Sequence, residues 1–191
     1  MFFQPERQLA LTDSLFLAQG DMYFSHMQTL TISVNMVGVM GKGLAARAKY
    51  QFPDVYVSYQ DLCKRKTLQI GRPALVKRES SLADQLSEVP VETDYGTWFL
   101  LFATKRHWKE DSKIEYIVSG LDWLKQNYKS LGITSLALPA LGCGLGNLDW
   151  KAVGPLMCSV VKDFDIKVCI YLPTEKPVEA KYLTPEYLLG R

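Results

Sequence analysis

The sequence contains no long apolar run and no strong imbalance of charge. No stretch approaches the roughly 20 apolar residues that a membrane-spanning helix needs, and the N-terminus lacks the basic and then apolar pattern of a secretory signal. We therefore expect a cytoplasmic protein that does not bind a membrane. The formal net charge is +2, with both signs scattered along the chain. The overall charge does not indicate a nucleic-acid-binding protein, and any contact with nucleic acid is expected to be local.

Cysteine and histidine are scarce. The chain has two histidines, His26 and His107, and four cysteines that lie far apart, Cys63, Cys143, Cys158 and Cys169. Neither the paired spacing of a zinc site nor a dense disulfide pattern is present, so we expect reduced thiols, no metal ion and no cofactor. Cys143 stands within a glycine-rich loop, where it is either a catalytic thiol or a small side chain in a loop that binds through its backbone. We favour the second interpretation.

The chain, residues 1–191 with 48% hydrophobic residues, suits a single domain. Strand-like apolar segments alternate with helix-like segments, which predicts an α/β fold, a three-layer α/β/α sandwich. We expect the core to span residues 14–173 and the tail to pack on it as coil with a short helix at its end. The expected strands are residues 14–18, 31–34, 73–77, 97–103, 135–139 and 167–172, and the expected helices are residues 43–51, 54–65, 112–128 and 149–164.

Some segments carry more specific predictions. The strand at residues 97–103 is the most continuously apolar, which indicates a central strand buried on both faces. Asp54 is expected to be the N-cap of the second helix. Ser112, with Glu115 three residues later, has the spacing of a capping box for the third helix. The polar and acidic stretch at residues 80–94 is expected to be a surface hairpin or loop.

An apolar strand followed by glycines and a helix start occurs twice. Glycine lacks Cβ, so the backbone can adopt positive φ and approach a ligand closely, and the free N–H groups at a helix start favour a phosphate. We call these segments the first glycine loop (residues 37–43) and the second glycine loop (residues 141–146), and we expect them to hold a pyrophosphate between them. Their glycines are Gly38, Gly41 and Gly43 in the first loop and Gly142, Gly144 and Gly146 in the second.

Two common nucleotide-binding motifs do not fit the first glycine loop. Lys42 follows a glycine, as in a phosphate-binding P-loop, but no Ser or Thr follows it to bind magnesium. The loop also lacks a glycine at the position that the dinucleotide-binding fingerprint requires. The sequence therefore does not indicate a nucleotide-hydrolysing P-loop or a dinucleotide-binding domain.

Three polar residues lie at expected strand ends, where ligands collect in open α/β sheets. Asp21 either accepts a hydrogen bond from an amino group such as that of adenine or caps a short turn. Asn35 either holds a ribose hydroxyl or satisfies backbone groups of its own loop. Lys105 follows the central strand, where neighbouring positive charge and partial burial favour its neutral, nucleophilic form. The ordinary alternative for Lys105 is a solvated charge.

Two aromatic rings follow Lys105 closely. His107 and Trp108 are candidates to stack on a nucleic-acid base or to hydrogen-bond it. The alternative for Trp108 is that its ring anchors the loop into the core.

Three motifs resemble the macrodomain family: residues 34–45 (VNMVGVMGKGLA), residues 104–108 (TKRHW) and residues 138–150 (LPALGCGLGNLDW). Within this family they are similar to the branch that holds the DarG-type DNA ADP-ribosyl glycohydrolase antitoxins and the terminal ADP-ribose protein glycohydrolases. The resemblance covers residues 14–173. It implies a central mixed sheet between helices, with ADP-ribose lying across the crest of the sheet.

The resemblance also implies roles for the site residues. Asp21 would accept from the adenine amino group, with Met22 beside it. Asn35 would orient the distal ribose, and Lys105 would be the catalytic lysine. Its amine would capture the aldehyde of the opened sugar as an imine, which water then releases, so no metal is needed. ADP-ribose would be lined by Val37, Gly38, Val39, Met40, Gly41, Lys42 and Gly43 on one side and by Leu141, Gly142, Cys143, Gly144, Leu145 and Gly146 on the other.

The implied function is that of an ADP-ribosyl glycohydrolase. Gly146 stands where the terminal glycohydrolases carry an acidic residue and the DarG-type proteins carry glycine, which favours ADP-ribosylated DNA, modified on thymidine, over ADP-ribosylated protein as substrate. Met36 and Val37 replace the paired asparagines of other hydrolase macrodomains, which argues against their mechanism. The resemblance implies a toxin ADP-ribosyltransferase as partner, and we expect a monomer.

Two alternative functions stay open at this point. One is a phosphatase acting on ADP-ribose 1″-phosphate, and the other is a module that binds ADP-ribose without turnover. The presence of both Lys105 and Asn35 favours an enzyme, because a binding module needs the glycine loops but no amine at the strand end.

Overall fold

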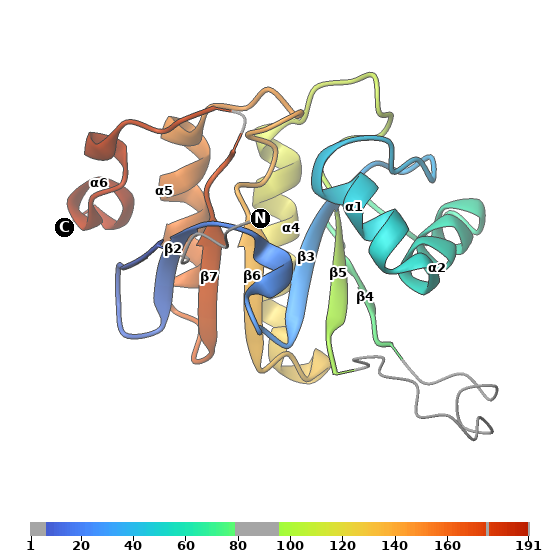
Figure 1. Ribbon diagram of the computed structural model, residues 1–191, viewed down its shortest axis with the longest axis horizontal. Helices are drawn as coiled ribbons and strands as arrows, with labels where there is room; N and C mark the ends of the chain where they lie inside the picture. The colour runs from blue at the N-terminus through green and yellow to red at the C-terminus, as the bar shows by residue number, and fades with distance from the viewer. Residues whose placement is uncertain (1–6, 79–95, 175, 191) are drawn as a thin grey trace, which may run out of the picture.

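A seven-stranded sheet forms the centre of the computed structural model, which describes residues 7–78, 96–174 and 176–190. The strand order is β1-β2-β7-β6-β3-β5-β4; the five inner strands are parallel, and the two edge strands are antiparallel to their neighbours (Figure 1). The predicted mixed sheet is therefore confirmed. The strands are β1 (Arg7–Ala10), β2 (Leu15–Gln19), β3 (Thr29–Val34), β4 (Ala74–Val76), β5 (Trp98–Ala103), β6 (Ser135–Pro139) and β7 (Lys167–Tyr171).

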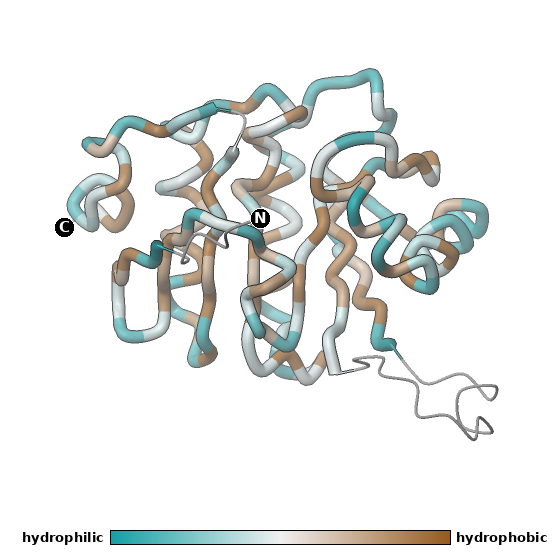
Figure 2. Tube along the Cα trace, viewed as in Figure 1, coloured by the Kyte–Doolittle hydropathy of each residue, from teal (hydrophilic) through white to brown (hydrophobic). Residues whose placement is uncertain are grey.

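Helices cover both faces of this sheet, which confirms the predicted α/β/α sandwich (Figure 1). One core lies between the sheet and the first two helices, and a second core lies on the opposite face. Figure 2 shows hydrophobic residues along the inner strands between these layers. The helices are α1 (Gly43–Gln51) and α2 (Pro53–Lys64) on one face, and α4 (Ile114–Leu131), α5 (Trp150–Val161) and α6 (Pro185–Leu189) on the other, with short 3-10 turns at η1 (Met22–Phe24) and η2 (Ala180–Tyr182).

Strand β5 contributes to both cores, as its continuous apolar sequence predicts. Phe99 and Leu101 belong to the core under α1 and α2, whereas Leu100 and Phe102 belong to the core under α4 and α5. Gly120 of α4 packs directly on Phe102, because a Cβ built on Gly120 would lie 2.2 Å from Phe102 Cζ. The absence of a side chain at this position brings α4 close to the sheet.

Helix α1 has the predicted bounds, but the predicted cap of α2 is wrong. The N-cap of α2 is Phe52, and Asp54 lies in the first turn, where its carboxylate pairs with Arg78 at 2.7 Å. Pro53 explains the shift, because its fixed φ and missing N–H suit the first helical position. Asp54 therefore lies near the start of the helix, as predicted, but two residues after the N-cap.

The predicted capping box of α4 is also wrong. Helix α4 begins at Ile114 after Lys113, whose side chain forms no capping hydrogen bond. The backbone N–H of Ser112 donates to the carbonyl of Gly146 at 2.9 Å instead. Contact with the second glycine loop therefore overrides the local capping pattern. The helix runs three residues beyond the expected end at residue 128 and stops at Gly132, which adopts φ +79°.

Both ends of the chain add elements to the sandwich. Strand β1 lies at the sheet edge with all four residues exposed, so it lacks the alternation of apolar and polar residues that predicts a strand. The tail forms η2 and α6, and Leu188 of α6 is buried in the core beside α5. The predicted surface loop at residues 80–94 lies outside the described residues. None of the helices within the described ranges has the length and apolar character to cross a membrane.

Replacing Gly120 with alanine is expected to destabilise the protein by about 1–3 kcal/mol, because the new methyl group overpacks against Phe102. Glycine-to-alanine changes at open helical positions usually act in the opposite direction. Urea denaturation of Gly120→Ala would measure the shift. Gln126→Ala, at an exposed position of the same helix, serves as the control and should change stability by less than about 0.5 kcal/mol. Equal stability of the two variants would contradict the packing argument.

Candidate functional site

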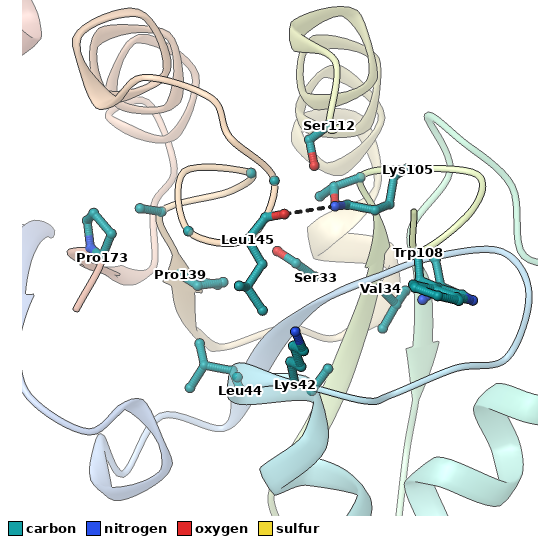
Figure 3. Close-up of a pocket in the computed structure, with 18 of the residues that line it drawn as sticks. Ser33, Val34, Lys42, Leu44, Lys105, Trp108, Ser112, Pro139, Leu145 and Pro173 are labelled. Atoms are coloured by element: carbon teal, nitrogen blue, oxygen red, sulfur yellow. Dashed lines mark hydrogen bonds between the residues drawn. The ribbon is translucent and has the colours of Figure 1, made fainter. Parts of the chain in front are cut away.

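The carboxyl ends of the parallel strands meet at one edge of the sheet, and the candidate site lies there. The segments that follow β2, β3, β5, β6 and β7 enclose a cavity of about 430 Å³ (Figure 3). Its lining includes Met22, Asn35, Val39, Gly41, Lys42, Gly43, Lys105, Trp108, Gly142, Gly144, Leu145 and Gly146, all of which were predicted from the sequence. The two glycine loops thus face each other across one cavity, as expected.

Asn35 holds the first glycine loop in shape. Its side-chain carbonyl accepts from the backbone N–H groups of Val37 at 3.0 Å and Val39 at 3.4 Å, and its amide nitrogen donates to the carbonyl of Val39 at 2.7 Å. The buried hydroxyl of Tyr59 donates to the same region, 3.0 Å from the Asn35 side-chain oxygen and 2.8 Å from its backbone oxygen. Of the two interpretations of Asn35, the structure thus shows the one in which its side chain satisfies backbone groups of its own loop. The second hydrogen of the amide leaves capacity for another acceptor, and the ribose contact stays a prediction.

The second glycine loop is held from outside, by the segment that follows β5. Lys105 Nζ donates to the carbonyl of Leu145 at 3.0 Å (Figure 3). The backbone N–H of Ser112 donates to the carbonyl of Gly146, and the side chain of Asn147 donates to Asp111 at 2.6 Å. These bonds fix the half-buried amine of Lys105 at the wall of the cavity.

Backbone N–H groups of both loops are free to bind an anion. Helix α1 starts after Lys42, which makes no side-chain capping bond, so the N–H groups of its first turn have no partner within the helix. Within the part of the chain that the structure describes, the N–H groups of Gly144, Leu145 and Gly146 form no hydrogen bond. Together with the positive end of the helix dipole, these donors favour a phosphate-containing ligand.

Asp21 lies beside the other end of the cavity. One oxygen of its carboxylate accepts from the N–H of Tyr23 at 3.1 Å, and the other pairs with Arg47 of α1 at 2.7 Å. The hydroxyl of Tyr23 donates to the carbonyl of Leu44 at 2.6 Å. Asp21 thus caps the turn at η1, which was one of the two interpretations given for it. Its ion pair with Arg47 also connects this turn to α1. Its neighbours Gly20 and Met22 line the cavity, and a contact of Asp21 with adenine stays a prediction.

The aromatic pair after Lys105 lies at the rim. The Trp108 side chain is 52% exposed and lines the cavity, so it does not anchor the loop into the core. Its ring is 5.3 Å from that of His107, and Lys109 Nζ lies 5.1 Å from the Trp108 ring. An exposed indole beside a cation provides a surface on which a flat ring can stack.

Several predicted residues do not line the cavity. Cys143 belongs to the second glycine loop, and its side chain is buried, which raises the pKa of its thiol to about 12. Since the thiolate is the nucleophilic form, this environment disfavours a catalytic thiol. The cavity lining does not include Asp21, Val37, Gly38, Met40, His107, Leu141 or Cys143.

The sequence analysis also missed part of the lining. The segment after β7, from Leu172 to Thr174, contributes to the cavity, and the strand-end rule that pointed to Lys105 would have found it. Ser33 and Ser112 carried no signal for a site, because Ser33 lies within a strand and Ser112 matched a capping motif. Within the described ranges, no three His, Cys, Asp or Glu side chains gather where they could hold a metal ion.

Comparisons with known proteins agree with this geometry. The family model of the Macro domain matches residues 98–157. A Thermosipho africanus protein named DNA ADP-ribosyl transferase-DNA ADP-ribosyl glycohydrolase fusion protein is 59% identical over 191 residues, which are 98% of this chain and 49% of that protein. The chain thus spans about half the length of this curated relative.

Solved structures give the same result. The structure described as Thermosipho africanus DarTG in complex with ADP-ribose has a TM-score of 0.89 and 59% identity, covering 98% of this chain and 49% of that one. The macrodomain of Mycobacterium tuberculosis DarG has a TM-score of 0.73 and 33% identity, covering 84% of this chain and 98% of that one. The chain therefore belongs to the macrodomain family. Within the family, it is similar to the macrodomains of DarG proteins.

The hydroxyl of Tyr59 generates a prediction about the first glycine loop. Tyr59→Phe is expected to lower the free energy of unfolding by about 1–3 kcal/mol, because it removes the donor to two buried oxygens of Asn35. Tyr56→Phe is the matched control, since the half-buried Tyr56 hydroxyl makes a 3.4 Å contact with the Gly38 carbonyl and accepts from Gln60 Nε2 at 3.1 Å but does not bond to Asn35. Thermal and urea denaturation would compare the two variants. A Tyr59→Phe protein as stable as the control would show that this hydroxyl does not support the loop.

Proposed function

We propose that this chain is an ADP-ribosyl glycohydrolase that removes ADP-ribose from modified DNA, with thymidine as the modified base. The observation that carries the proposal is the cavity between two loops of free backbone N–H groups, with the amine of Lys105 held at its wall by the Leu145 carbonyl. A phosphate-binding cleft with a nucleophile at one end suits a substrate whose reacting carbon lies beyond a diphosphate.

The parts of ADP-ribose match the order in which binding groups are arranged along the cavity. The diphosphate would accept from the N–H groups at the start of α1 and from those at residues 144–146. The adenine would lie toward Met22 and Asp21, and the distal ribose toward Asn35 and Lys105. A structural relative with 59% identity is described in complex with ADP-ribose, which supports ADP-ribose as the ligand.

Lys105 would act as the nucleophile. The neutral amine attacks the anomeric carbon, a bond from Nζ to this carbon forms, and the bonds from the carbon to the ring oxygen and to the base break. The two protons that the amine loses pass to the ring oxygen, which becomes a hydroxyl, and to the base. Water then adds to the resulting imine and releases ADP-ribose, which restores the amine. The hydrogen bond from Nζ to the Leu145 carbonyl would aim the amine at the sugar before this attack.

Three features favour DNA over protein as the carrier of ADP-ribose. Relatives at 34% identity or more are named DNA ADP-ribosyl glycohydrolase or a fusion that includes this activity. Gly146 provides no carboxylate to assist the release of a protein-linked ester. Trp108 offers an exposed ring at the rim, where a base next to the modified one would stack.

An ADP-ribosyltransferase that modifies DNA is the expected partner. The fusion relative from Thermosipho africanus carries both activities in its printed name. By this comparison the present chain would act as the antitoxin, reversing the modification that the transferase makes.

Lys105→Ala is expected to abolish release of ADP-ribose from an ADP-ribosylated single-stranded oligonucleotide, because the nucleophile is lost. The Kd for ADP-ribose should stay within about threefold of the unmodified protein, because the second glycine loop keeps its bonds from Ser112 to Gly146 and from Asn147 to Asp111. Lys105→Arg should be inactive as well, since it keeps the charge but not the nucleophile. Gel analysis of the oligonucleotide and calorimetric titration with ADP-ribose provide the two readouts.

Lys113→Ala is the matched control for this experiment, because Lys113 is an exposed lysine of the same segment outside the cavity lining. Normal cleavage by Lys105→Ala would disprove the assigned role. Binding without cleavage by the unmodified protein would indicate a binding module. A parallel assay on glutamate-linked ADP-ribosyl protein separates the two substrate classes, and release from protein alone would contradict the DNA assignment.

Trp108→Ala is expected to raise KM for the modified oligonucleotide by about fivefold to a hundredfold, since base stacking on an aromatic ring contributes about 1–3 kcal/mol. The Kd for free ADP-ribose should change much less. Trp108→Phe, which keeps a ring, should recover most of the loss. Steady-state kinetics with oligonucleotides of different length would measure the effect, and an unchanged KM would exclude stacking on Trp108.

A further inference from the structure

Ser112 carries a buried hydroxyl that neither the fold nor the proposed function uses. The residue is 5% exposed and lines the cavity. Within the described residues, its Oγ has no hydrogen-bond partner. Figure 3 shows this hydroxyl directed toward the side of the cavity where Lys105 donates to Leu145. Buried hydroxyls almost always have a partner, so one that faces a ligand cavity without a partner calls for an explanation.

The hydroxyl is not required to hold the second glycine loop. The backbone N–H of Ser112 already bonds to the carbonyl of Gly146, Lys105 Nζ bonds to the carbonyl of Leu145, and Asn147 bonds to Asp111. Helix α4 begins two residues later without using Ser112 as a cap. The side chain of Ser112 therefore remains available for another group.

The second glycine loop covers the hydroxyl closely. A Cβ built on Gly146 would lie 2.4 Å from Ser112 Oγ, and one built on Gly142 would lie 3.1 Å from Ser112 Cβ. A side chain at position 146 and the Ser112 side chain would occupy the same space. Because both covering residues are glycines, only backbone has to move to expose the hydroxyl.

We propose that Ser112 is a further ligand-binding residue of this site, whose hydroxyl bonds to a hydroxyl group of the distal ribose when ADP-ribose enters the cavity. The assignment rests on the proposed function. It follows from position, since Ser112 bonds to Gly146 and Lys105 bonds to the adjacent Leu145, so the hydroxyl lies near the Lys105 amine, where the reacting sugar is placed (Figure 3). A small outward shift of the second glycine loop accompanies binding and gives the hydroxyl its partner.

The experiment compares Ser112→Ala with Thr31→Val. Thr31 is the matched control, because its hydroxyl is also buried without a partner among the described residues but lies in strand β3 outside the cavity lining. Calorimetric titration with ADP-ribose and with ADP, which lacks the distal ribose, measures binding, and thermal denaturation of the same samples measures stability.

Ser112→Ala is expected to raise the Kd for ADP-ribose by about fivefold or more and the Kd for ADP by less than about twofold, because one hydrogen bond to the distal ribose is lost. Its Tm should not fall, since the removed hydroxyl has no partner in the protein itself. Thr31→Val is expected to leave the Kd for ADP-ribose and the Kd for ADP unchanged, and its Tm should not fall.

Other outcomes overturn the inference. Equal losses for ADP-ribose and ADP would place the hydroxyl at the diphosphate instead of the ribose. A lower Tm with an unchanged Kd for ADP-ribose would give Ser112 a purely structural role. Failure of the unmodified protein to bind ADP-ribose would overturn the proposed function together with this inference, whereas normal binding by both the unmodified protein and Ser112→Ala would overturn the inference alone.

Discussion

The common direction of the five inner strands is the constraint on which the site depends. Because these strands are parallel, the segments that follow β2, β3, β5, β6 and β7 all begin at the same edge of the sheet, although they are spread from residue 20 to residue 174. Four of these segments contribute particular groups: backbone donors from the two glycine loops, an amine from the segment after β5, and a turn from the segment after β2. No single segment could supply all three, and the sheet brings them together without further connections.

The two glycine loops are stabilised by different means, with consequences for the chemistry. The first loop is held from within by Asn35 and supported from α2 by the buried hydroxyl of Tyr59. The second loop is held by its bonds to the segment that carries Lys105. Movement of the second loop therefore changes the position of the amine. The first loop is held by Asn35 and Tyr59, independently of the amine. A ligand that contacts the second loop acts directly on the group proposed to react with it.

Much of this arrangement follows from short-range signals. The strand and glycine pattern predicted both loops, and the strand-end rule predicted Asn35 and Lys105, because these features depend on local backbone chemistry. The capping patterns at Asp54 and Ser112 gave wrong predictions for two other reasons. Pro53 shifts the start of α2. Ser112 bonds to Gly146, 34 residues away along the chain, and does not cap α4. Strand β1 gave no signal because its side chains face solvent, and its pairing with β2 is a property of the folded sheet.

Position 146 connects the geometry of the loop with the choice of substrate. The terminal ADP-ribose protein glycohydrolases that the sequence resembles carry an acidic residue there, which would assist the release of an ester. In this chain the same volume lies against the Ser112 hydroxyl and the Gly142 backbone, so a carboxylate could enter only if the loop moved away from both. A hydroxyl can bind a sugar but cannot act as a general base near neutral pH without a partner, whereas a carboxylate can. Glycine at 146 and serine at 112 thus form one structural unit, which agrees with the proposed reaction, in which the Lys105 amine attacks and the leaving base needs no carboxylate beside it.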